Sequence, residues 1–170
     1  AAGNPVKTAA IVHEDGPFGS NMAKIMAAKL PEQGIEVVET ISHPTPHRDF
    51  NNIALRVKAS GANILIPSNY LNEYTLMARA LRQQRAELMA IYSILGGAAS
   101  NIKFVRENND VAQYVMDCNH WYDPNKPESQ ALAANVAEAG LDLTYDVMVS
   151  YATIQVIADA LERGASTDRK

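Results

Sequence analysis

The sequence predicts an α/β domain in which a parallel sheet of about five strands is covered by helices on both faces. Short apolar runs alternate with amphipathic segments along residues 6–117. The apolar runs are continuous rather than alternating in polarity, which is typical of parallel strands buried on both faces. After Pro124 the pattern changes, and two helical segments follow one another with no strand between them. We therefore expect right-handed crossovers within the sheet region and two additional C-terminal helices.

The strands are predicted where a short run rich in Val, Ile or Ala ends at a turn residue. Pro44 and Pro46 close the second run, and Gly96 with Gly97 closes the fourth. The expected strands are residues 6–12, 35–41, 62–67, 88–94 and 113–116.

The helices are predicted where apolar residues recur every three or four positions. In the first of them Met22, Ile25 and Leu30 share one face, and Gly34 is the expected C-terminal stop. Asp49 is placed to cap the second helix. The pattern after Pro124 predicts helices over residues 128–139 and 147–163.

Composition and charge exclude several classes of function. The chain has 170 residues, 47% of them hydrophobic, which is enough for one domain with a substantial core. Its net charge is -4, and Lys and Arg are scattered singly, which argues against a nucleic-acid-binding surface. No apolar run reaches the roughly 18 residues that cross a membrane, and no signal peptide is present in the chain. The single cysteine, Cys118, excludes an intrachain disulfide and is interpreted as a small buried hydrophobic residue.

No complete catalytic set follows from the sequence. His13, Glu14 and Asp15 could form an acid–base pair or bind a metal, but neighbours at a strand end point in different directions, so a solvated loop is the interpretation. His43 and His47 lie in a proline-broken loop, where a spacing of four does not align metal ligands. A glycine-rich phosphate loop, a nucleophile elbow and a Cys-x-x-Cys pair are all missing from the sequence. We therefore predict neither an enzyme nor a cofactor or metal.

The strand ends indicate where a ligand would bind. Open parallel sheets place their ligand sites at the carboxyl ends of the strands. Here those ends carry residues 13–19 (HEDGPFG), 68–71 (SNYL) and 93–97 (SILGG). Residues 119–123 (NHWYD) also mix aromatic and hydrogen-bonding groups and are interpreted as a packed loop, with a ligand contact as the alternative.

Four motifs occur in the order of a known family. They are an acidic pair with a later Phe-Gly (residues 13–19), Asp-Phe with a later Ser-Gly-Ala-Asn (49–63), Leu-Arg-Gln-Gln (81–84), and Tyr-Asp running to Ala-Leu-Glu-Arg-Gly (145–164). This set resembles the type I periplasmic binding proteins, and specifically the leucine/isoleucine/valine-binding branch that serves ABC importers. The similarity covers roughly residues 6–167, nearly all of the chain.

The resemblance implies a flavodoxin-like lobe of a receptor whose ligand lies between two lobes. Residues 1–122 would be the α/β ligand-binding second lobe, and residues 123–170 a helical segment that returns to the first lobe. Members of the family are about twice as long, and the chain begins at Ala1 rather than at Met, so we expect a fragment or a processed chain. A periplasmic location and ABC importer membrane subunits as partners are also implied. A homodimer through the C-terminal helices is a further expectation, because their apolar side would otherwise lack cover.

The resemblance also implies which residues contact the ligand. The family holds its ligand with residues after the first, third and fourth strands of this lobe. In this sequence the corresponding positions are Phe18 with Gly19, Asn69 with Tyr70 or Leu71, and Ile94 or Leu95. Amino-acid binders have an acidic residue at the last position, where this chain has Ile94-Leu95. The expected solute is an amino acid or another small carboxylate, aromatic ones included.

Two other functions remain open at this point. One is a regulatory ligand-sensing lobe of the same architecture, which a DNA-binding or signalling segment elsewhere in the protein would favour. The other is a small flavodoxin-like enzyme, which catalytic turnover or a tightly bound nucleotide would favour.

Overall fold

The computed structural model describes residues 5–94 and 98–164. The chain divides into two compact units, Ala1–Asn119 and His120–Lys170, which are called the sheet unit and the helical unit below. Among the described helices of both units, none combines the length and the apolar character that crossing a membrane requires.

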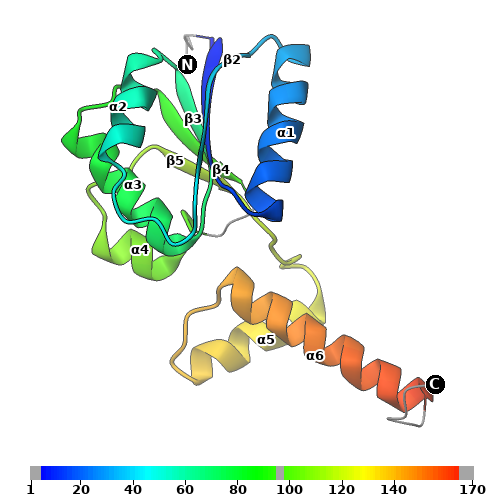
Figure 1. Ribbon diagram of the computed structural model, residues 1–170. Coiled ribbons are helices and arrows are strands. Elements are labelled where there is room, and N and C mark those ends of the chain that lie inside the picture. The colour runs from blue at the N-terminus through cyan, green and yellow to red at the C-terminus, as the bar shows by residue number, and fades with distance from the viewer. Residues whose placement is uncertain (1–4, 95–97, 165–170) are drawn as a thin grey trace. The chain divides into compact units, whose positions relative to one another are not determined.

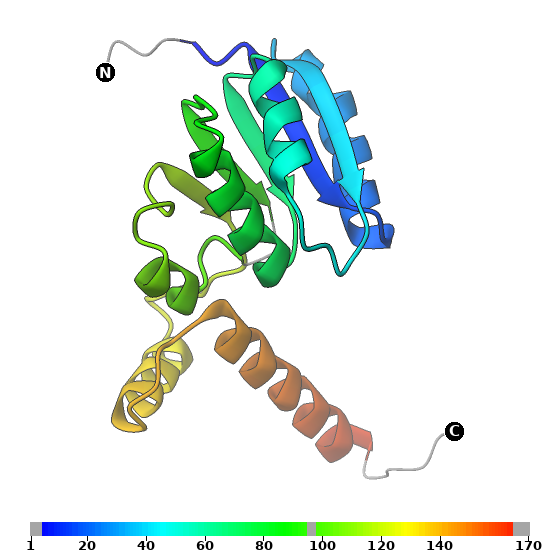
Figure 2. The same ribbon diagram turned by 60° about the vertical axis from the view of Figure 1, so that its left-hand side comes forward.

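The sheet unit contains a five-stranded parallel sheet, as the sequence predicts (Figures 1 and 2). Its strand order is β2-β1-β3-β4-β5. β1, in which six of seven residues are buried, therefore lies inside the sheet. Each strand starts one or two residues later than the apolar run suggests, and each except β4 also ends one or two residues later. They are β1 (Thr8–Glu14), β2 (Glu36–His43), β3 (Ile64–Ser68), β4 (Ala90–Ile94) and β5 (Val115–Cys118).

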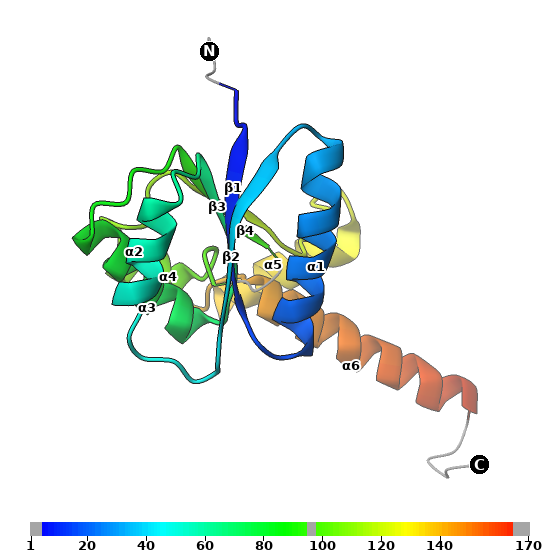
Figure 3. The same ribbon diagram turned by 45° about the horizontal axis from the view of Figure 1, so that its top comes forward.

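Helices lie on both faces of the sheet, one on the first face and three on the second (Figure 3). The first face is covered by α1 (Pro17–Glu32), and the second by α2 (Asn51–Ala59), α3 (Leu71–Gln83) and α4 (Ile102–Glu107). Phe50 occupies the N-cap position of α2, so the predicted cap at Asp49 is one residue early. The Asp49 carboxylate still accepts the backbone N–H of Asn51 at 3.0 Å.

α4 is not predicted from the sequence pattern, because six residues are too few for a helical period to show. The sequence signal for α4 is Asn101, its N-cap residue. The side-chain oxygen of Asn101 accepts the backbone N–H groups of Lys103 and Phe104 at 3.0 and 3.2 Å, which satisfies two otherwise unpaired helix donors.

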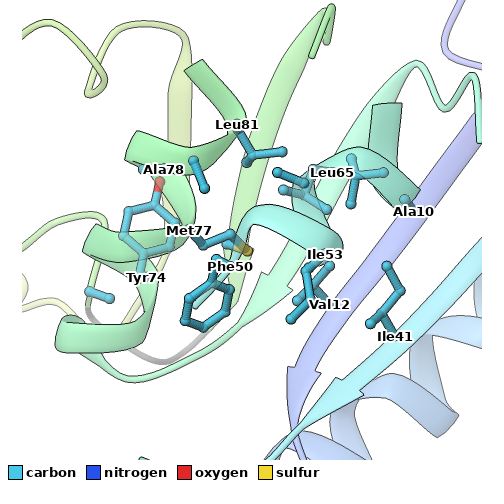
Figure 4. Packing of buried hydrophobic residues seen from close by; sticks show 14 of the residues in the cluster. Ala10, Val12, Ile41, Phe50, Ile53, Leu65, Tyr74, Met77, Ala78 and Leu81 are labelled. Atoms are coloured by element: carbon cyan, nitrogen blue, oxygen red, sulfur yellow. The ribbon is translucent and has the colours of Figure 1, made fainter. Parts of the chain in front are cut away.

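The larger core lies between the sheet and α2, α3 and α4 (Figure 4). Leu65 from β3 and Met77 from α3 are completely buried there, and Phe50 closes the cluster at the start of α2. The smaller core lies under α1, where Ala23 packs with the opposite side of the strands. These two cores hold β1 and β3 in place and thereby position the loops that follow these strands.

One part of the sheet lacks a helix over it among the described residues. α1 packs on β1, β2 and β3. In contrast, Tyr92 of β4 and Met116 of β5, which are paired across the two strands, are both exposed. Cys118 lies on the same side of β5 and is also exposed. The interpretation of Cys118 as a buried residue is therefore wrong, because its burial depends on a covering element and not on the strand itself.

The helical unit consists of α5 (Pro127–Glu138) and α6 (Tyr145–Gly164) with the segment that leads into them. Trp121 in that segment is 62% exposed, so the packed-loop interpretation of residues 119–123 is wrong for this side chain. A groove of about 250 Å³ lies within this unit. Its apolar lining comes from Trp121, Leu132, Met148, Val149 and Tyr151.

Candidate functional site

The strand order places a topological switch point between the carboxyl ends of β1 and β3. From β1 the chain first moves to one side, to β2, and then crosses back to β3 on the other side. The helices that follow β1 and β3 therefore lie on opposite faces of the sheet, and such a switch point is where open parallel sheets bind ligands. β1 and β3 are paired up to His13 and Ser68, so their ends are level.

An aromatic pair lies at this switch point. Phe18 follows β1 and Tyr70 follows β3, and their ring centroids are 6.4 Å apart with the rings tilted by 31°. Phe18 is half-buried, whereas Tyr70 is 48% exposed although it is a large aromatic residue. Two residues separated by 52 positions in the sequence thus form one apolar surface at the edge of the sheet.

The side chain of Glu14 lies at the amino-terminal end of α1 and is hydrogen-bonded to its backbone. Its carboxylate is buried and accepts the backbone N–H groups of Gly16 and Gly19. A Cβ atom at Gly19 would meet the backbone carbonyl of Glu14, so the close approach requires glycine. The interpretation of residues 13–15 as a solvated loop is therefore wrong for His13 and Glu14, which are both buried.

This contact limits what the switch point can bind. The N–H groups at a helix start ordinarily attract anions. In α1 the Glu14 carboxylate already occupies two of them, including the N–H of Gly19. A carboxylate or phosphate group of a ligand would be repelled there rather than held.

Asn69 lies between the aromatic pair and a buried histidine. Asn69 and His43 are 3% and 2% exposed, and the Asn69 Nδ2 group is hydrogen-bonded to Nε2 of His43. His43 Nδ1 is 2.8 Å from the carbonyl oxygen of Pro44. Burial lowers the pKa of His43 below its ordinary value, which keeps the ring neutral at pH 7.

Several buried polar side-chain atoms of the sheet unit have no hydrogen-bond partner within the part of the chain that the structure describes. They are Ser68 Oγ, Asn69 Oδ1, the Tyr74 hydroxyl and both carboxylate oxygens of Asp117. Burial raises the pKa of the Tyr74 phenol, and the negative charge of Asp117 raises it further. Native proteins pair nearly all such atoms, so Ser68 Oγ and Asn69 Oδ1, at the carboxyl end of β3, indicate a place for a bound molecule or water.

The remaining predicted contact residues have different environments. Leu71 is the first residue of α3 and packs against the larger core. Ile94 is buried in the smaller core under α1. Leu95 lies outside the described residues. Of the two alternatives after β3, Tyr70 is exposed whereas Leu71 is half-buried.

The described residues contain no group of three or more His, Cys, Asp or Glu side chains placed to hold a metal ion. His43 and His47 do approach each other, with ring centroids 5.6 Å apart, but they stack face to face and Phe50 packs edge-on against both rings. The arrangement is that of an aromatic cluster.

An α/β lobe with an aromatic, hydrogen-bonding carboxyl edge is suited to holding a small molecule, and the comparisons with known proteins give the family. All of residues 1–170 match the sequence model of the family described as periplasmic binding protein. The chain belongs to this family, whose members are solute-binding proteins, and the resemblance described above is confirmed.

Individual relatives agree with this assignment. The Leu/Ile/Val-binding protein BraC3 of Rhizobium johnstonii is 26% identical over 163 residues, which are 95% of this chain and 43% of that protein. The chain thus spans less than half the length of this curated relative.

Two solved structures share the fold. The leucine-binding protein LivK of Thermotoga maritima superposes with a TM-score of 0.83 at 16% identity, over 96% of this chain and 47% of that one. A solute-binding protein of an ABC transporter from R. palustris, in complex with 4-hydroxybenzoate, has a TM-score of 0.77 at 19% identity, over 96% and 46% of the two chains.

Proposed function

We propose that this chain is the second lobe, with a helical return segment, of a receptor that binds a small solute for an ABC importer. Residues 1–122 would form the lobe and residues 123–170 the segment that belongs to the first lobe. The family match over the whole chain and the names of the relatives support this proposal. The observation on which it depends most is the Phe18–Tyr70 pair at the switch point between β1 and β3.

The receptor would work without catalysis. It would be periplasmic and would deliver its solute to the membrane subunits of the importer. Support for this comes from the family and from relatives that are named as substrate-binding proteins of ABC transporters.

The proposed ligand is an amino acid or a small carboxylate, aromatic ones included. Phe18 and Tyr70 would cover its apolar part, and Asn69 would form a hydrogen bond with it. Gly19 allows the close approach of the chain to Glu14. Leu71 anchors the start of α3 in the larger core. Leu95 would complete the site. Because Glu14 occupies the start of α1, the ligand carboxylate is expected to be held by the other lobe.

Titration of the 170-residue chain, followed by NMR, tests these contacts at the millimolar concentrations that a half-site requires. Leucine and 4-hydroxybenzoate are suitable probes. Phe18→Ala and Tyr70→Ala should each weaken the binding of the preferred probe about five- to tenfold, since a ring contact contributes roughly 1 kcal/mol or more.

Tyr114→Ala is the matched control for these substitutions. Tyr114 is 82% exposed and precedes β5, at the opposite edge of the sheet. Its substitution should leave binding unchanged. Equal losses in Tyr70→Ala and Tyr114→Ala would contradict the assignment of the site to the carboxyl edge.

A further inference from the structure

His43, the last residue of β2, has a defined tautomer. Its Nδ1 atom is 2.8 Å from the carbonyl oxygen of Pro44, and a carbonyl oxygen can only accept a hydrogen bond. The proton of the neutral ring is therefore on Nδ1, and Nε2 has a free lone pair. The hydrogen bond from Asn69 Nδ2 to Nε2 agrees with this tautomer.

The orientation of the Asn69 amide depends on this hydrogen bond. The two ends of an asparagine amide have nearly the same shape, so their hydrogen bonds decide which way the group points. Nδ2 faces His43, and Oδ1 is left buried with no partner among the described residues. If Nε2 of His43 gains a proton it becomes a donor, and two donors would then face each other. A half-turn of the amide removes this conflict by placing Oδ1 on Nε2 and directing the NH2 group away from His43.

We propose that His43 is a positioning residue that determines which end of the Asn69 amide is offered to the solute. With a neutral ring the site offers the acceptor Oδ1, which favours a solute with a hydrogen-bond donor, such as an ammonium group or a phenolic hydroxyl. With a protonated ring it offers the NH2 group, which favours an acceptor. The statement about the solute rests on the proposed function, whereas the coupling of His43 to Asn69 does not.

The groups around His43 determine the pH range of this exchange. Burial has the largest effect and lowers the pKa of His43 below 6.5, and the hydrogen bond to the Pro44 carbonyl opposes it. Positive charge on His47 or on His13 of β1 would lower the pKa further, and Glu73 of α3 raises it. The ring is therefore neutral at pH 7, and the amide should turn only below pH 6.5.

NMR of the 170-residue chain between pH 8 and pH 5 tests the coupling without any ligand. The side-chain amide signals of Asn69 should change with the same midpoint as the ring signals of His43. In Asn69→Asp the carboxylate accepts a hydrogen bond from the protonated ring, so the His43 midpoint should rise by about one pH unit or more.

Asn72→Asp is the matched control, because it adds the same charge three residues later at an exposed position of α3. Its effect on the His43 midpoint should be much smaller. Asn69 amide signals that stay constant while His43 titrates would overturn the coupling. Equal shifts in Asn69→Asp and Asn72→Asp would also overturn it.

A second experiment compares 4-hydroxybenzoate with benzoate, which differ only by the phenolic hydroxyl. The chain should bind 4-hydroxybenzoate roughly fivefold more tightly at pH 7.5, as expected for one hydrogen bond, and this preference should disappear at a pH below the His43 midpoint that the ligand-free titration gives. The same preference at both pH values would overturn the statement about the solute. Absence of binding by leucine and both benzoates would count against the proposed function, while the ligand-free titration still decides the coupling.

Discussion

The helices α3 and α6 have similar apolar spacing but opposite environments. Met77 and Leu81 of α3 are buried by the sheet of their own unit. Ile154 and Ile157 of α6 are 65% and 50% exposed, although their spacing of three residues, like the spacing of four in α3, puts them on one side of a helix. Apolar periodicity thus predicts a helix correctly in both units, but it does not predict what covers the helix. The sheet unit contains its own cover, whereas the described part of the helical unit leaves α6 without one.

Truncation of one leucine in each unit should give the largest contrast. Leu65→Ala removes a completely buried side chain and should lower the free energy of unfolding of the sheet unit by about 2–5 kcal/mol. Leu161→Ala makes the same change at an exposed position of α6 and should cost less than about 1 kcal/mol. Urea unfolding followed by circular dichroism measures both values. Similar losses would mean that α6 is packed as tightly as the sheet.

A pair of helix glycines provides the second contrast. Gly19→Ala places a Cβ atom against the carbonyl of Glu14 and should destabilise the sheet unit by about 1–3 kcal/mol. Gly164→Ala, at the end of α6, meets no atom of the described residues within 4 Å and should be neutral or slightly stabilising. The measurement is the unfolding midpoint in urea. A neutral Gly19→Ala would show that the Glu14 contact at the start of α1 can relax freely.

Self-association is the third contrast, and the homodimer through the C-terminal helices stays a prediction. Ile154→Lys puts a charge into the exposed apolar side of α6 and should weaken dimerisation at least about tenfold, or 1.4 kcal/mol. Thr153→Lys adds the same charge at the neighbouring exposed position and should have a smaller effect. Sedimentation velocity over a range of concentrations measures the association. A chain that stays monomeric at all concentrations would contradict the homodimer.

The smallest expected effect is the pH dependence of the sheet unit. The pKa of His43 is lower in the folded chain than its ordinary value of 6.5, so the unfolded chain binds the proton more readily. The free energy of unfolding should therefore decrease as the pH falls through 6.5 and level off once the folded chain is protonated as well. His43→Gln should reduce this slope in urea titrations at a series of pH values. An unchanged slope would mean that His43 does not determine it.

The sequence predicts the sheet well because five buried strands leave continuous apolar runs. The expectation that Phe18 and Tyr70 lie at one edge follows from the sequence because each comes after a strand, and strand ends of a parallel sheet meet at one edge. Their choice as ligand contacts comes from the family resemblance. The hydrogen bond between Asn69 and His43 joins residues 26 positions apart and depends on the pairing of β1 with both β2 and β3. No local pattern records such a contact.

The burial of polar residues could not be predicted from the sequence either. Glu14 looks like a solvated acidic residue, yet it is buried because α1 begins within its reach. The Gly16-Pro17 pair after it was the available signal, since proline is favoured in the first turn of a helix. Exposure of Cys118 depends on a covering element that the strand pattern does not specify.

We infer that this chain provides one side of a two-sided binding site. A complete receptor with a dissociation constant near ~1 µM has about 8 kcal/mol of binding free energy. Loss of about half the contacts removes several kcal/mol, while the entropic cost of immobilising the solute is nearly unchanged.

Isothermal titration calorimetry of the 170-residue chain against amino acids and aromatic carboxylates, leucine and 4-hydroxybenzoate among them, tests this claim most directly. We expect dissociation constants in the millimolar range or weaker, about a thousandfold above those of a complete site. A dissociation constant of about 10 µM or tighter, with one solute bound per chain, would mean that the site is complete within these residues, and it would contradict the claim.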